Sequence, residues 1–552
     1  MVIALVPKGT EIGELAALGM APGLMSAGLG SVPAAQTYLD ISQGNRVFDS
    51  LYDSELPPNV DGGICGPAYS AAVVERAESA PADIVPGLLA ATLRRAGERC
   101  LVRDMSLARL AGLTERLRGN DLLIAIERAP PEKARALAIG IAGRGFDGNL
   151  TSDSTRADGY VLTTDVAPTI LERFGQALPD AMSGQPVRAE GDVRVAAIES
   201  LGARMAVISE RRGPVIGISL LVWLLAFGLA LALSRGAAVG AAVPWLALSV
   251  IYLPLILLLG AALEPPRAAE QLLVMIGAPL LAALTLAALS DYRAFAVASA
   301  LVVLAYAGDV LAGSQLTSLS LLGPNPGLGV RFYGIGNELE AVLAVLVVAG
   351  TGAGLAGFAP GLSPRACAMT FLSTGLLCAT IFAAGRFGAD VGAAIVLPFG
   401  AAVAAATIAA RRARVGLLVI SAPIALLGLI VLADLISGAN AHLTRSVLDA
   451  GGLGDLSDVA QRRLQLSAHS FTRPIVFLFL PLLAGFGVLA VARHDALRTW
   501  LRDVPAIRAG LVGALAAIAC GTLANDSGAL LLVIGAAYLV AFVAVAWTER
   551  PQ

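Results

Sequence analysis

The sequence predicts two parts of different fold class: an N-terminal α/β domain over residues 1–213 and an all-α polytopic membrane domain of about eleven transmembrane helices over residues 214–552. Composition changes sharply near residue 213, after which long apolar runs are separated by short charged breaks. Before it, short strand-like runs alternate with helix-like segments. The whole chain is 57% hydrophobic, which is typical of a multi-pass membrane protein.

The first part contains three apolar runs that are short enough to be strands. They are residues 2–7, 121–130 and 136–143, and residues 85–97 have the pattern of a helix. Alternation of the two kinds of element predicts a layered α/β domain.

The second part is divided by its apolar runs. Because about 20 apolar residues cross a bilayer, we predict spans at residues 214–233, 242–263, 271–289, 294–313, 338–357, 366–385, 391–410, 415–433, 474–492, 505–524 and 527–547.

Arginine clusters predict the orientation of these spans, since positive charge in short loops marks the cytoplasmic side. Arg411, Arg412 and Arg414 lie in one such loop, and residues 493–508 hold four more arginines two spans later. Counting spans from them places the C-terminus in the cytoplasm and residues 1–213 outside the cell membrane. The long loop 434–473 is also placed outside although it contains arginines, and long loops follow the charge rule poorly. No signal peptide is visible at "MVIALVP", so we expect export by an upstream start or by the first span itself.

With this orientation, the unusual polar residues of the second part gather at the exterior ends of the spans. The stretch "VRFYGIGNELEAVL" (330–343) is the densest. Ionisable groups at membrane depth are costly unless they face a cavity or a partner, so we predict an exterior polar pocket. The candidate catalytic residues are Glu338, Glu340, Asp390 and Asp526, with Asp309 and Asp434 as further members. The candidate substrate-binding residues are Arg331, Tyr333, Asn337, Arg386, His442, Arg445 and Asn525.

A structural interpretation of the same residues stands beside the functional one. Arg331 or Arg386 pairs with nearby carboxylates to lock helices together, and the glycine-rich turns only allow close packing. The glycine and proline density of residues 323–336 favours a ligand-lining loop over a plain connector.

Residues 151–187 of the first part contain a fairly specific motif. A strand leads into Thr164-Asp165, Pro168-Thr169 and Ile170-Leu171, and a later segment contains Pro179, Met182, Gly184 and Pro186. This pattern resembles the C-terminal signature of the alkaline phosphatase superfamily, which includes sulfatases and phosphoglycerate mutases. Residues 21–46 are similar, more loosely, to the stretch after the first strand of that superfamily, and Ser31 falls near its nucleophile position.

The resemblance implies a two-metal hydrolase, but the metal ligands are missing. The histidines of the chain are His442, His469 and His494, so residues 1–213 contain none, and Pro7 stands where the family has a metal-binding aspartate. We therefore expect a reduced, noncatalytic relative that binds no metal and is retained to bind a ligand or dock a partner. Cys65 and Cys100 form a disulfide if this domain faces an oxidising compartment, or else remain free.

Three classes of function remain open. The first is a transferase or ligase of the bacterial cell envelope that acts on lipid-linked sugar or phosphate substrates. The second is a transporter or flippase, and the third a noncatalytic envelope scaffold or sensor. The expected partners are the lipid bilayer and a lipid-linked substrate or envelope proteins, and the cofactor is left open. A net charge of −2 with only two lysines, Lys8 and Lys133, argues against nucleic acid.

Overall fold

The computed structural model of the 552-residue chain forms two compact units. The α/β unit contains Met1–Ser209 together with Asn325–Phe332, and the helical unit contains Glu210–Pro324 and Tyr333–Gln552. The structure describes residues 1–57, 63–66, 69–130, 135–234, 239–409, 467–468, 470–472, 474–525 and 527–548. The predicted span 415–433 and nearly all of the loop 434–473 lie outside these residues.

A six-stranded mixed sheet forms the centre of the α/β unit, in the order β3-β1-β4-β5-β2-β7. Its strands are β1 (Val2–Val6), β2 (Ala21–Ser26), β3 (Leu101–Asp104), β4 (Leu123–Glu127), β5 (Ala136–Ala142) and β7 (Tyr160–Leu162). β5 runs antiparallel to both β4 and β2, whereas β1 pairs in parallel with β3 and β4. β6 (Asn149–Ser152) and β8 (Val187–Glu190) form a separate two-stranded sheet. The predicted α/β class of the first part is thus confirmed.

Helices cover this sheet, and apolar side chains fill the space between them. They are α1 (Ile12–Ala17), α2 (Ala34–Gln43), α3 (Ala71–Glu78), α4 (Leu88–Arg95), α5 (Leu107–Thr114) and α6 (Thr163–Arg173), with a short 3-10 helix at Asp49–Leu51. Buried residues form two cores. One joins β4 and β5 to α4 and α6, and the other joins the sheet to α1 and α5. Burial of these runs stabilises the domain by about 25 cal/mol per Å² of apolar surface.

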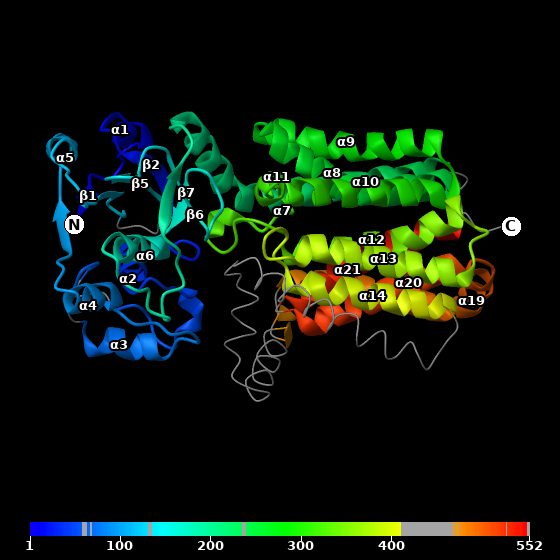
Figure 1. The fold of residues 1–552 in the computed structure, drawn as a ribbon. Coiled ribbons are helices and arrows are strands. Elements are labelled where there is room, and N and C mark those ends of the chain that lie inside the picture. Colours follow the sequence, from blue (N-terminus) through cyan, green and yellow to red (C-terminus); the bar gives the residue numbers. More distant parts are fainter. Residues whose placement is uncertain are drawn as a thin grey trace. The chain divides into compact units, whose positions relative to one another are not determined.

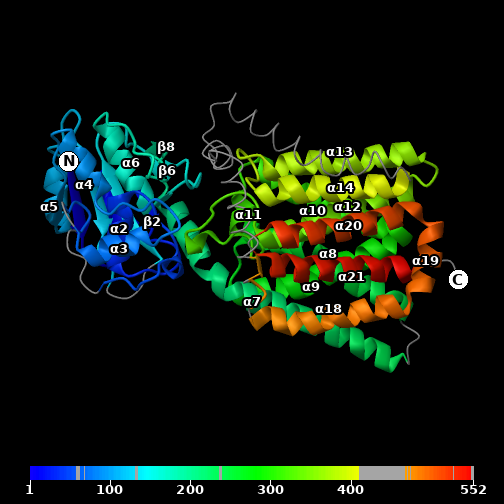
Figure 2. The same cartoon turned by 90° about the horizontal axis from the view of Figure 1, so that it is seen from below.

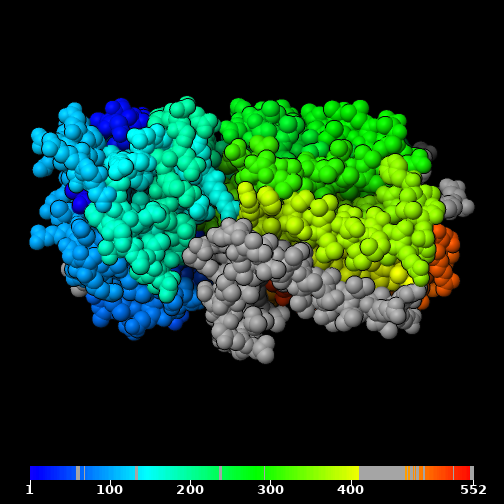
Figure 3. All heavy atoms as spheres, in the orientation of Figure 1, coloured from blue at the N-terminus to red at the C-terminus, as the bar shows by residue number. Residues whose placement is uncertain are grey.

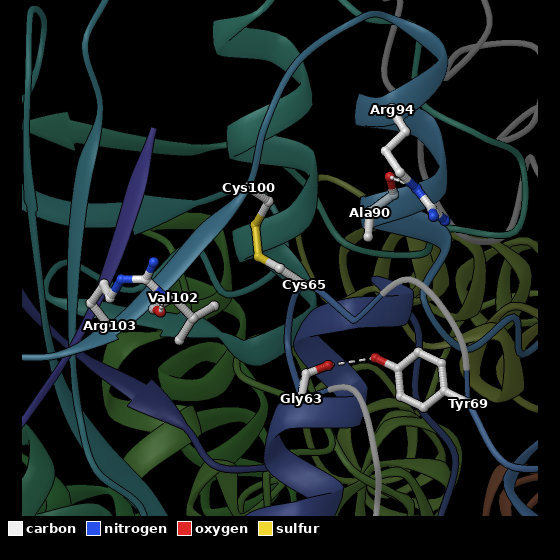
Figure 4. The surroundings of a disulfide bond; sticks show 8 residues. All are labelled: Gly63, Cys65, Tyr69, Ala90, Arg94, Cys100, Val102 and Arg103. Atoms are coloured by element: carbon white, nitrogen blue, oxygen red, sulfur yellow. Dashed lines mark hydrogen bonds between the residues drawn. A yellow bond between two sulfur atoms is a disulfide. The ribbon is translucent and has the colours of Figure 1, made fainter.

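Cys65 and Cys100 form a disulfide that links residues 35 positions apart, with a Cα–Cα distance of 5.7 Å (Figure 4). Beside it, the Tyr69 hydroxyl donates a hydrogen bond to the Gly63 carbonyl at 2.5 Å. The disulfide connects the residue before β3 to the loop before α3. Of the two alternatives for Cys65 and Cys100, the structure therefore contains the disulfide.

The helical unit is a bundle of long apolar helices (Figures 1 and 2). Its long helices are α7 (Val195–Leu233), α8 (Val239–Leu263), α9 (Arg267–Ala288), α10 (Asp291–Leu311), α12 (Asn337–Phe358), α13 (Pro364–Ala383), α14 (Val391–Ala409), α18 (Pro474–Ala492), α20 (Pro505–Ala524) and α21 (Gly528–Thr548). Within the described residues, nine helices are long and apolar enough to cross a membrane. By length and composition these helices are consistent with the predicted multi-pass membrane protein. α18 coincides with the predicted span 474–492.

The first span differs from its predicted start at residue 214. α7 begins at Val195, and its first part, through Ser209, belongs to the α/β unit. Two arginines, Arg211 and Arg212, lie within this uninterrupted helix. Both form ion pairs with carboxylates of the helical unit, Arg211 with Glu270 and Arg212 with Glu338.

α12 lies inside the bundle, where it packs against α10, α14, α20 and α21. Small residues allow the helices to approach closely: Gly352 of α12 meets Gly510 of α20, and Gly400 of α14 meets Gly513 of α20. In the space-filling view of Figure 3, the green atoms of α8–α10 and the yellow-green atoms of α12 and α13 form adjoining bands. Two short helices mark opposite ends of the bundle in both ribbon views: α11 (Gln315–Leu319) at one end and α19 (His494–Asp503) at the other.

Candidate functional site at one end of the helical unit

Loops far apart in the sequence meet at the α11 end of the helical unit. The backbone N–H of Ile335 donates to the Gly388 carbonyl at 3.1 Å, which joins the loop before α12 to the loop before α14. The Ser467 hydroxyl donates to the Thr522 carbonyl at the end of α20 at 2.6 Å, and the Ser470 hydroxyl accepts from the Ala529 N–H at 2.9 Å. The described parts of the loops before α12, before α14 and after α20 therefore lie at one end of the bundle.

Among the described residues at this end, Glu340 is the most deeply buried carboxylate, with 1% of its surface exposed. Asn525, the residue that ends α20, donates from its side-chain amide to Glu340 Oε2 at 2.9 Å and to Asn337 Oδ1 at 3.2 Å. Three polar side chains from the start of α12 and the end of α20 thus form one buried cluster, which we call the Glu340 cluster (Glu340, Asn337 and Asn525). The Asn525 amide donates to one carboxylate oxygen and so orients the Glu340 side chain.

Two glycines border the Glu340 carboxylate. A Cβ added to Gly392, on α14, would lie only 2.6 Å from Glu340 Oε1, closer than real Cβ atoms approach. Gly521, on α20, is the second, with a corresponding distance of 3.9 Å. On the side of α14 a larger residue at position 392 would overlap the carboxylate, so α14 needs glycine there to accommodate Glu340. At Gly521 the added Cβ would make only an ordinary contact with Glu340, and it is Leu531 that it would overlap.

Asp390 is buried next to this cluster and has a clear structural role. Its Oδ1 accepts from the Gly392 N–H at 2.8 Å, immediately before α14 begins at Val391. A carboxylate in this position satisfies an otherwise unpaired N–H group and interacts favourably with the helix dipole. Asp309 acts similarly at α11, where it accepts from the N–H groups of Leu316 and Thr317 at 3.0 and 2.7 Å.

Glu338 forms an ion pair that the sequence analysis did not anticipate. Its Oε1 accepts from Arg212 Nη1 at 3.1 Å, and Arg212 Nη2 donates to the Gly323 carbonyl at 2.5 Å. The neighbouring Arg211 bonds Glu270 of α9 at 2.9 Å and the Pro265 carbonyl at 2.9 Å. Adjacent arginines of α7 therefore hold two other helices. The two adjacent arginines in "ERRG", directly before an apolar run, were the sequence signal that could have predicted these ion pairs.

The remaining candidates are dispersed or lie outside the described residues. Tyr333 is half-buried in the helical unit, and Arg386 is exposed in the turn before Asp390. Arg331 belongs to the α/β unit, so it is not assigned to the Glu340 cluster. His442, Arg445, Asp434 and Asp526 lie outside the described residues.

Residues of the motif at 164–186 connect helix α6 to the two-stranded sheet of the α/β unit. Asp165, fully buried in the first turn of α6, accepts from the Ser152 and Ser154 hydroxyls at 2.7 and 2.6 Å and from the N–H groups of Leu162 and Gln185 at 2.9 Å each. The Thr169 hydroxyl accepts from the Val187 N–H at 2.8 Å. Burial raises the pKa of Asp165, and the four donors oppose that rise. These contacts attach α6 to β6 and β8.

Ser31, the candidate nucleophile position, is exposed, and its hydroxyl accepts from Arg135 Nε at 3.2 Å. In the part of the chain that the structure describes, no three His, Cys, Asp or Glu side chains are grouped to hold a metal ion. The resemblance to a two-metal hydrolase thus finds no ligand set among these residues.

No family model, curated protein or solved structure matches this chain. The function must therefore be argued from the geometry of the site itself.

Proposed function

We propose that this protein is an integral membrane transferase or ligase that acts on lipid-linked sugar or phosphate substrates, with Glu340 as its general base. The observation that carries the proposal is the Glu340 cluster: a carboxylate that is 1% exposed at the start of α12 and is oriented by a hydrogen bond from the Asn525 amide. An ionisable group inside a membrane bundle is a functional-site candidate by default. Glu270 is equally buried and forms an ion pair with Arg211, so it serves as the comparison residue.

The depth of the cluster favours lipid headgroup chemistry over transport. Glu340 is the fourth residue of α12, so it lies about 4.5 Å along the axis from Asn337 at a rise of about 1.5 Å per residue. A transport site is typically near the bilayer midplane, about 15 Å below the edge of the hydrocarbon core. Asn525 ends α20 and Asp390 precedes α14, so these side chains are also at helix ends. This depth matches the phosphate of a lipid-linked substrate.

In the proposed reaction, Glu340 takes the proton from an acceptor hydroxyl while that oxygen bonds to the transferred group and the lipid phosphate leaves. The Asn525 amide holds the carboxylate in a fixed orientation during this step. His442 and Arg445 stay candidates for binding the phosphate.

We further propose that the cluster faces the exterior of a bacterial cell membrane, with the α/β unit extracytoplasmic and the C-terminus cytoplasmic. The Cys65–Cys100 disulfide supports this orientation because disulfides persist in oxidising compartments. The α/β unit is then a degenerate relative of the alkaline phosphatase superfamily, a proposal supported by the residues of the motif at 164–186.

The test compares Glu340→Gln with Glu270→Gln in purified protein reconstituted in liposomes. Both residues are the fourth of their helix and 1% exposed. With polyprenyl-phosphate-linked sugars as substrates, Glu340→Gln should lose about 100-fold or more in turnover, the usual loss for a general base. Its thermal stability should be kept, because a buried charge is removed.

Glu270→Gln should behave in the opposite way. It leaves Arg211 without its carboxylate, which costs about 3 kcal/mol or more of stability, while turnover per folded molecule stays at the wild-type value. Full turnover by Glu340→Gln would eliminate the proposed role. Movement of a solute across the liposome without any turnover would favour the transporter instead.

A further inference from the structure

A segment of the chain between two membrane helices is built into the α/β unit. Residues Asn325–Phe332 follow α11 and precede α12, yet they belong to the same compact unit as Met1–Ser209. Their first residues form a 3-10 helix, Pro326–Leu328. The polypeptide therefore leaves the helical unit for eight residues and returns to it at Tyr333.

Polar contacts hold this segment at three points. The Leu328 carbonyl accepts from the Gly30 N–H at 2.7 Å, and the Gly329 carbonyl accepts from Arg46 Nη2 at 2.6 Å. The Asn325 side-chain amide donates to the Ser209 hydroxyl at 2.9 Å. Two of these bonds are made by backbone carbonyls, so they depend on the path of the segment and not on its side chains.

Two glycines of the segment are packed so closely that no larger residue fits in their place. A Cβ on Gly327 would overlap the Met205 carbonyl oxygen. Gly329 has φ +72°, and a Cβ on it would overlap the Gly28 carbonyl oxygen and lie 2.7 Å from Ser26 Oγ. At the end of the segment, the Phe332 ring is 6% exposed and stacks on Tyr160 with centroids 5.2 Å apart.

Arg46 contributes a positive charge where the α/β unit contacts residues 325–332. Besides Gly329, its guanidinium donates to Ser26 Oγ at 3.2 Å, and the carboxylates of Asp40 and Asp165 lie near enough to stabilise its charge. Burial lowers the pKa of Arg46, and these two carboxylates oppose that effect. Arg46 is half-buried, and a guanidinium that donates to a backbone carbonyl of the segment makes a strong, charge-assisted hydrogen bond.

We infer that the α/β unit works as an internal docking domain whose ligand is residues 325–332 of its own chain. Four residues, 333–336, join the docked segment to Asn337 and Glu340. Docking thereby restrains the loop that leads into the Glu340 cluster, and undocking alters the cluster. This part of the inference rests on the proposed function, whereas the docking itself does not.

The test uses Gly327→Ala, which adds one methyl group against Met205 without straining the backbone. Gly361→Ala, in a turn with open space around the added methyl, is the matched control. The reporter is Phe332→Cys in the full chain with Cys367, Cys378 and Cys520 changed to alanine, and a hydrophilic maleimide measures its exposure. We expect Gly327→Ala to increase the labelling rate about tenfold, equivalent to about 1.4 kcal/mol of lost docking, and Gly361→Ala to leave it unchanged.

A second reporter, Asn337→Cys, tests the coupling by its labelling rate, and turnover is measured as a separate readout. Its labelling should rise with Gly327→Ala and not with Gly361→Ala, and turnover should fall in parallel. An intact Cys65–Cys100 disulfide and a normal melting transition show that the α/β unit remains folded. Unchanged Phe332→Cys labelling disproves the docking, and increased labelling there without change at Asn337→Cys disproves the coupling. Absence of turnover in every form rejects the proposed function alone.

Discussion

At the scale of single residues, Asp40 of α2 is an uncommon buried carboxyl group. Burial raises its pKa from 3.8 to about 7, although Gln36 and Gln43 donate hydrogen bonds to it at 2.7 and 3.2 Å and Arg46 and Arg76 lower the pKa. Desolvation is the larger effect because the side chain is 1% exposed. Asp40 therefore changes its charge near neutral pH.

Asp40→Asn should change how the stability of the α/β unit depends on pH. A pKa that is higher in the folded state than in the unfolded state means that the folded state binds the proton more tightly between pH 3.8 and about 7. The contribution of Asp40 is thus fully present below pH 4 and is lost as pH rises towards 7 and above. Melting curves of wild type and Asp40→Asn should diverge over this window, with the variant relatively more stable at high pH. A constant difference between the two proteins from pH 4 to 8 would contradict this expectation.

At the scale of elements, the two carboxylates of α12 have different partners because of helix geometry. Glu338 and Glu340 are two residues apart, so they lie about 200° apart around the helix axis. Glu338 reaches Arg212 of α7, whereas Glu340 faces Asn525 and Gly392. The sequence placed both residues in one pocket, and only the positions of the neighbouring helices separate their roles.

Helix α6 depends on Asp165 more than on any surface ion pair nearby. Asp165→Asn replaces one acceptor oxygen by a donor among four donors, so we expect a loss of about 2–4 kcal/mol in the free energy of unfolding. The control is Asp153→Asn, which breaks an exposed pair with Arg188 and should cost at most about 1 kcal/mol. Thermal unfolding of the full chain in detergent measures both. Equal losses would mean that the buried network contributes no more than the surface pair.

At the scale of the whole molecule, the orientation in the membrane decides whether the Glu340 cluster meets exterior substrates. Ala312, after α10, is exposed at the cluster end of the bundle, and Leu362, between α12 and α13, is exposed at the opposite end, where Arg293 donates to the Gly357 carbonyl at 2.8 Å. In intact cells, a membrane-impermeant maleimide should label Ala312→Cys and leave Leu362→Cys unlabelled. The reverse pattern would place the cluster in the cytoplasm and reject the exterior assignment.

The sequence by itself determined the class of each part of the chain. Alternating short strands and helices predicted the α/β fold, and apolar runs of about 20 residues predicted the membrane helices, because burial in a core or a bilayer leaves a periodic or continuous apolar pattern. It also determined which loops gather at one end, since each span reverses the side of the membrane.

Only the tertiary structure decided how the polar residues are grouped. The pairing of Arg212 with Glu338, the hydrogen bond from Asn525 to Glu340 and the docking of residues 325–332 join positions that are 126, 185 and about 300 residues apart. Such contacts follow from the packing of helices and from the space around glycines, which no local pattern records. The sequence thus specified which groups are available at the end of the bundle, and packing selected their partners.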